Sequence, residues 1–114
     1  MNRLTPIALA LLLATLERPA AASDRWTFCV ASALGAKDVW ITEVFLATLD
    51  GERLEANLKS ILVRQGSPRI VAQCPQPNDD KTSVVNAQVA AEDYNHKLGA
   101  TLHAVSAQEF PPRR

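Results

Sequence analysis

The sequence predicts a small single domain of the α+β class, with about four mostly antiparallel strands and two helices in the order β-β-α-β-α-β. Three observations predict this class. Two segments before residue 48 have the alternation or the β-branched content of strands, two later segments repeat apolar residues at helical spacing, and the chain has 2 cysteines. We expect both helices to pack on one face of the sheet, and we expect a single disulfide.

The first two strands are predicted at Arg25–Ala33 and Val39–Ala47. Apolar side chains alternate along the first segment, as they do in a half-buried strand. The second is rich in β-branched and aromatic residues on both of its faces, which is typical of a strand that is central or covered on both sides. The short connection around Gly35 favours an antiparallel hairpin.

Two helices are predicted next along the chain. The first starts after Asp50 and stops at Gly66, and the second runs from about Thr82 to Leu98. The apolar stripe of the first consists of Leu54, Leu58, Ile61 and Leu62, and that of the second of Val84, Ala87, Ala91, Tyr94 and Leu98. On the polar side of the first helix, Glu55 and Lys59 have the spacing of an ion pair.

The remaining strands are predicted at Arg69–Cys74 and Thr101–Val105. Pro75 ends the former because proline has no N–H group to donate to a neighbouring strand. The domain is therefore expected to span residues 23–106, and residues 107–114 are expected to form a flexible C-terminal tail.

Residues 1–22 have the layout of a secretory signal peptide. Arg3 provides the positive start, Leu4–Leu16 is mostly apolar, and Ala20–Ala22 gives small residues for cleavage. The apolar run is shorter than the roughly 20 residues that a membrane-spanning helix needs. We therefore expect an exported protein, periplasmic or secreted, that is not stably inserted in the membrane after cleavage.

The compartment bears directly on the cysteines. Cys29 and Cys74 are far apart in the sequence, so they form no C-x-x-C redox pair, and two cysteines alone cannot complete a four-ligand zinc site. In an oxidising compartment such a pair is expected to form a disulfide, Cys29–Cys74.

The charge balance argues against nucleic acid as a partner. The 12 Lys and Arg side chains are balanced by 12 Asp and Glu. No basic cluster of the kind that neutralises phosphates is present. We expect an envelope or extracellular protein, or a glycan, to be the partner.

The sequence contains no recognisable catalytic or cofactor-binding motif. His96 and His103 are the candidates for a small hydrolase, but neither has a nucleophile at a useful spacing. Asp79 and Asp80 precede the second helix, where capping is their expected role, and they do not belong to a calcium-loop pattern. We expect neither a cofactor nor a metal site.

The aromatic residues give the main indication of a binding surface. If both helices cover one face of the sheet, Trp26, Phe28 and Trp40 are candidates for a contact surface on the other face. The alternative is that these side chains belong to the core. The sequence thus favours a small exported, non-enzymatic binding protein.

A second interpretation comes from a family resemblance. The pattern LxxxLxxILVRQG of Leu54–Gly66 and the LGA that ends the second helix resemble SPOR-type peptidoglycan-binding domains over the segment from Val39 to Val105. The resemblance implies a peptidoglycan-binding module. The additional strand and the two cysteines depart from that family, and the resemblance assigns no role to any single residue.

Overall fold

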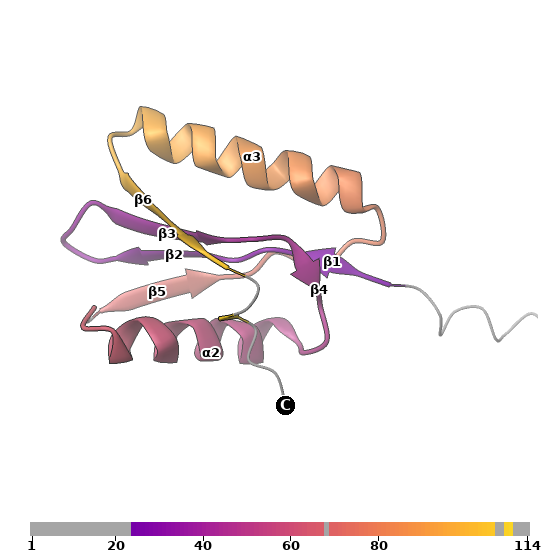
Figure 1. The fold of residues 1–114 in the computed structure, drawn as a ribbon, viewed down its shortest axis with the longest axis horizontal. Coiled ribbons are helices and arrows are strands. Elements are labelled where there is room, and N and C mark those ends of the chain that lie inside the picture. The colour runs from indigo at the N-terminus through magenta and orange to yellow at the C-terminus, as the bar shows by residue number, and fades with distance from the viewer. Residues whose placement is uncertain (1–23, 68, 107–108, 111–114) are drawn as a thin grey trace, which may run out of the picture.

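The computed structural model describes residues 24–67, 69–106 and 109–110. Residues 1–22, where the sequence predicts a signal peptide, lie outside this described part. The structure confirms the predicted α+β class, with a central sheet between two helices (Figure 1). In the described residues, no helix is both long and apolar enough to cross a membrane.

The main sheet contains four strands in the spatial order β5-β2-β3-β6. They are β2 (Val30–Ala33), β3 (Asp38–Thr42), β5 (Ile70–Gln73) and β6 (Thr101–Val105). Strand β2 pairs antiparallel with β3 and with β5, whereas β3 pairs parallel with β6. The sheet is therefore mostly antiparallel, as predicted, and β5 and β6 are its two edges.

The first two predicted strands are each interrupted. A second, two-stranded ladder pairs β1 (Trp26–Thr27) with β4 (Phe45–Leu46). The register shifts by one residue between this ladder and the β2–β3 ladder, which is the signature of a β-bulge. The buried Thr42 hydroxyl stabilises the break, because it accepts a hydrogen bond from the Cys29 N–H at 2.9 Å.

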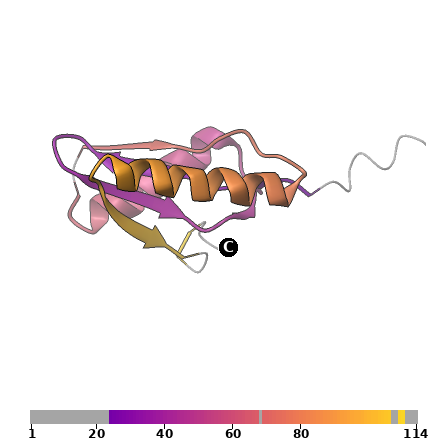
Figure 2. The ribbon, with the colours of Figure 1, turned by 90° about the horizontal axis from the view of Figure 1, so that it is seen from above.

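The two helices lie on opposite faces of the sheet, so the prediction that they share one face is wrong (Figures 1 and 2). They are α2 (Gly51–Arg64) and α3 (Lys81–Lys97). Since β3, β5 and β6 run parallel to one another, each helix belongs to a crossover connection. The α2 crossover moves from β3 to one edge, and the α3 crossover returns to the other edge. Crossover connections between parallel strands are right-handed. Two crossovers that move across the sheet in opposite directions must therefore lie on opposite faces.

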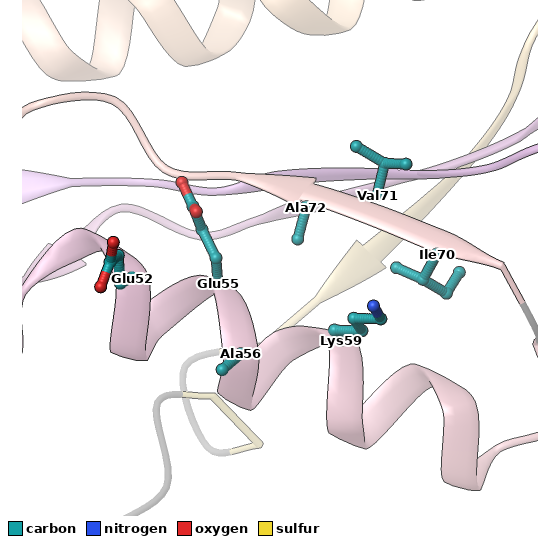
Figure 3. Close-up of a pocket in the computed structure, with 7 residues that line it drawn as sticks. All are labelled: Glu52, Glu55, Ala56, Lys59, Ile70, Val71 and Ala72. Atoms are coloured by element: carbon teal, nitrogen blue, oxygen red, sulfur yellow. The ribbon is translucent and has the colours of Figure 1, made fainter.

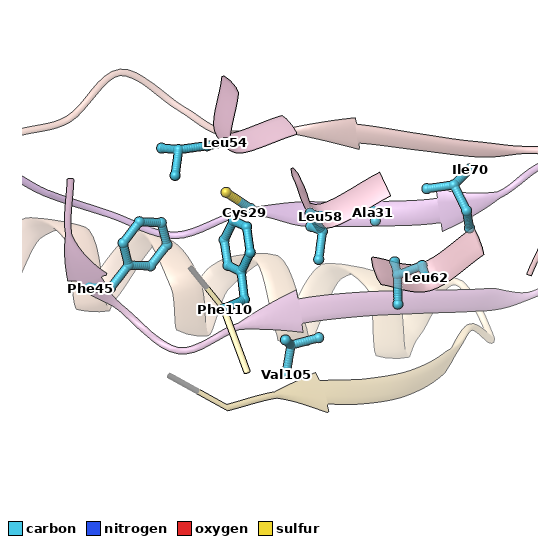
Figure 4. Packing of buried hydrophobic residues seen from close by; sticks show 9 residues of the cluster. All are labelled: Cys29, Ala31, Phe45, Leu54, Leu58, Leu62, Ile70, Val105 and Phe110. Atoms are coloured by element: carbon cyan, nitrogen blue, oxygen red, sulfur yellow. The ribbon is translucent and has the colours of Figure 1, made fainter. Parts of the chain in front are cut away.

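Helix α2 covers the face that holds the larger core cluster (Figure 4). Asp50 caps the helix by accepting from the Arg53 N–H at 2.9 Å. The buried members of the cluster are Cys29, Ala31, Phe45, Leu54, Leu58, Leu62, Ile70, Val105 and Phe110. The predicted apolar stripe of this helix is thus confirmed at its three leucines.

Phe110 belongs to this core, which corrects the expectation of a flexible tail at this position. Its side chain is 0% exposed and meets Phe45 edge-on, with ring centroids 5.4 Å apart. The backbone N–H groups of Glu109 and Phe110 both donate to the Ser106 carbonyl, which turns the chain back toward the core. The other residues of the predicted tail lie outside the described part of the chain.

Helix α3 covers the opposite face and buries little of its surface. Its buried residue Val84 joins a smaller cluster with Phe28, Val39 and Ile41. The predicted apolar stripe is wrong for this helix at Ala87, Tyr94 and Leu98, which are all exposed, the last two at 63% and 65%.

The face of α3 toward the sheet is partly polar, which explains this difference. Val84, Gln88, Ala91 and Asn95 are the less exposed residues of the helix and recur at helical spacing. The Gln88 side-chain amide donates to the Thr42 carbonyl at 2.7 Å, and that of Asn95 donates to the Ala91 carbonyl at 2.8 Å. Polar side chains with such partners turn inward although their type predicts a solvent-facing position.

The Cys29–Cys74 disulfide is present, as predicted, with an S–S distance of 2.06 Å. Both cysteines are next to the last pair of the β2–β5 ladder, Val30 and Gln73. The covalent link therefore fixes the end of edge strand β5 to the core.

Candidate functional site

The outer edge of β5 carries backbone groups that no other strand of the described chain pairs. The Leu34 N–H donates to the Arg69 carbonyl, so along the antiparallel ladder the N–H and C=O groups of Val71 and Gln73 also point to β2. The groups of Ile70 and Ala72 must then point outward. No strand of the described chain pairs with this side of β5.

A groove runs along this edge between β5 and α2 (Figure 3). Its volume is about 390 Å³, and its lining residues are Glu52, Glu55, Ala56, Lys59, Ile70, Val71 and Ala72. The side chains of Ile70 and Ala72 point toward α2, whereas Val71 points to the other side of the sheet.

The groove has oppositely charged ends. Figure 3 shows Glu52 and Glu55 near the Ala72 end of the strand, while Lys59 lies close to Ile70. A strand that adds to this edge therefore meets both unpaired backbone groups and a polarised groove.

Glu55 marks the limit of the open edge. Its carboxylate accepts a hydrogen bond from the Cys74 N–H at 3.0 Å, so the outward donor that follows Ala72 is already satisfied. The sequence predicts an ion pair of Glu55 with Lys59 instead. Sequence reasoning missed the role of Glu55 because the spacing within a helix does not reveal which strand lies beside it.

A second polar cluster contains His103. Its Nε2 atom lies 2.8 Å from Asp38 Oδ1, and its ring stacks on Trp40 with centroids 5.1 Å apart. The parallel pairing of β3 with β6 sets Trp40 opposite His103. Asp38 and His103 are each about two-fifths exposed at the side chain, at the edge of the sheet opposite β5.

This cluster resembles only part of a catalytic apparatus. A carboxylate can orient an imidazole and stabilise its charged form, but nucleophilic catalysis also needs a hydroxyl or thiol next to the imidazole. No such group is hydrogen-bonded to His103 in the described residues. His96, the other candidate, is exposed on α3. The described residues also contain no group of three or more potential metal ligands.

The three aromatic residues of the predicted contact surface do not form one surface. Phe28 is buried in the smaller cluster, under α3, and Trp26 packs against the same cluster. Trp40 packs against the other cluster, on the α2 side. The Lys81 amine lies 4.4 Å from the centre of the Trp26 ring, a cation–π contact. The alternative assignment to the core therefore holds for Phe28, and the two tryptophans border different faces.

Comparisons with protein-family models, with curated proteins and with solved structures give no match for this chain. The resemblance to SPOR-type domains thus remains a prediction from two short motifs.

Proposed function

We propose that this chain is a small exported binding protein without catalytic activity, and that a partner strand adds to the outer edge of β5. Export is supported by the signal-peptide pattern of residues 1–22 and by the disulfide, since disulfides persist in oxidising compartments. The position of the unpaired edge beside a polarised groove supports the mode of binding.

The single observation that carries this proposal is the outward direction of the Ile70 and Ala72 backbone groups. In strand addition, main-chain hydrogen bonds provide the affinity and neighbouring pockets provide the specificity. The β5 edge has both elements, because the groove toward α2 lies under the side chains of the same two residues.

A proline at position 72 tests the mode of binding. Ala72→Pro removes an outward donor but leaves the β2–β5 hydrogen bonds in place, because these involve Val71 and Gln73. The purified wild-type chain and the variant would each be incubated with an envelope fraction of the exporting cell and cross-linked. Val89→Lys, on the exposed side of α3, serves as the surface control.

We expect the wild type and Val89→Lys to retain the same partner and Ala72→Pro to lose it. Equal retention by all three chains, each shown to be folded by near-UV circular dichroism, would contradict binding at the β5 edge. Export itself is tested by intact mass, which should give an exported chain that begins at Ser23.

Hydrolysis with His103 as the base is the alternative, and the observation that favours it is the hydrogen bond to Asp38. A screen with ester, peptide and glycoside substrates tests it. Activity that His103→Gln abolishes while the fold is kept would favour an enzyme over a binding protein.

A further inference from the structure

We propose that the partner at the β5 edge is a second copy of this chain, joined by antiparallel β5–β5 pairing about a two-fold axis at Val71. This inference rests on the proposed function, because it names the occupant of the same edge. It extends the four-stranded sheet of each copy into one continuous sheet.

The hydrogen-bonding groups of β5 select this register. Within the described chain, Ile70 and Ala72 are the β5 residues that offer both an N–H and a C=O on the outer side, so symmetric pairing should match these two residues. An axis at Ala72 would bring Ile70 opposite Cys74, whose N–H already donates to Glu55. An axis at Ile70 would bring Ala72 opposite Pro68, which has no N–H group. An axis at Val71 pairs Ile70 with Ala72 of the second copy, and every donor finds an acceptor.

The side chain at the axis is suited to this pairing. Val71 is 44% exposed on the side of the sheet away from α2. In the proposed register it meets Val71 of the second copy in a non-hydrogen-bonded pair, where side chains approach most closely. An apolar β-branched residue that is exposed in the single chain thus becomes covered in the dimer.

The charges of the groove are self-complementary under the same two-fold rotation. Glu52 and Glu55 lie near the Ala72 end of β5, and Lys59 lies near Ile70. Antiparallel pairing sets the acidic end of one groove opposite the basic end of the other. The resulting attraction favours the antiparallel over the parallel arrangement and contributes to specificity.

The first test measures the mass of the purified, disulfide-intact chain by sedimentation equilibrium from about 10 µM to about 1 mM, since dimer content depends on concentration. We expect a reversible monomer–dimer equilibrium. Val71→Lys should weaken the dimer about tenfold or more, because it places like charges directly opposite each other. The matched control Val89→Lys, also at an exposed valine, should leave it unchanged. A wild-type chain that stays monomeric throughout, or equal weakening by both variants, would overturn the proposal.

The second test probes the axis directly. In a non-hydrogen-bonded antiparallel pair the Cα atoms are about 4.5 Å apart, which lies within the range that a disulfide spans. Val71→Cys should therefore form a covalent dimer under mild oxidation, while Val89→Cys should not. A failure of Val71→Cys to cross-link at concentrations where the wild type dimerises would place the contact elsewhere.

The two proposals fail in different ways. A monomeric chain that binds a different protein, with loss of binding in Ala72→Pro, would overturn the dimer and leave the edge as the binding site. A chain that neither dimerises nor binds through β5 would overturn both.

Discussion

Removal of the disulfide should take away a large part of the stability of this domain. Cys29 and Cys74 are 45 positions apart, and a loop of this length gives about 4 kcal/mol in the chain-entropy relation at 25 °C. Cys29 is also 0% exposed, so Cys29→Ala adds a packing loss of about 1 kcal/mol. The double variant Cys29→Ala/Cys74→Ala should therefore lose about 4–5 kcal/mol, near the total stability of a marginal domain.

Equilibrium urea unfolding of the oxidised wild type, the reduced wild type and the double variant measures this loss. The reduced wild type keeps both side chains, so its difference from the variant measures the packing of the two cysteine side chains. We expect most of the loss to appear on reduction alone. A total loss below about 1 kcal/mol would refute the reasoning, because the covalent link would then contribute little to the stability of the β2–β5 end of the sheet.

Three further substitutions test the packing and the capping by the same urea measurement. Phe110→Ala should cost about 3–5 kcal/mol because the ring is fully buried. As a control, substitution of the exposed neighbour, Glu109→Ala, should change stability by less than about 0.5 kcal/mol. An equally small effect of Phe110→Ala would show that Phe110 belongs to a flexible tail after all. Asp80→Ala should cost about 1 kcal/mol because the Asp80 carboxylate accepts from the Thr82 N–H in the first turn of α3. Asp79→Ala should be close to neutral, and equal effects of the two substitutions would argue against this cap. Trp40→Ala should cost about 2 kcal/mol, since the indole is only half-buried, and should leave β5-edge binding intact; lost binding with unchanged stability would restore Trp40 as a contact residue.

The elements with local signals were predictable from the sequence. The leucine spacing of α2 and its Asp50 cap gave the helix, and the cysteine count with the predicted export gave the disulfide. The last strand was predicted with the bounds that the structure has, Thr101–Val105. The signal peptide remains a prediction.

The arrangement of these elements was not predictable in the same way. The apolar residues on both faces of Val39–Ala47 did indicate a strand covered on both sides, but the placement of the helices depends on the strand order, which no local pattern reveals. The inward turn of Gln88 depends on a carbonyl of β3, far away in the sequence.

The candidate site was missed for a related reason. Val71 has the residue type of a core strand, and nothing in RIVAQC tells whether the strand is central or at an edge. The aromatic residues suggested a single contact surface, but Trp26 and Phe28 lie on the α3 side of the sheet and Trp40 lies on the α2 side.

Hydrogen exchange at the β5 amides tests the central claim, that this edge is the binding surface, most directly. Residue-resolved NMR exchange would follow the N–H groups of Ile70 and Ala72 at low and at high concentration of the chain, with Val71 as the internal reference because its N–H points to β2. We predict that exchange of Ile70 and Ala72 slows about tenfold or more as concentration rises, while Val71 is protected throughout. Exchange at Ile70 and Ala72 that stays as fast as in exposed amides, under conditions where the chain has dimerised or bound a partner, would contradict the account.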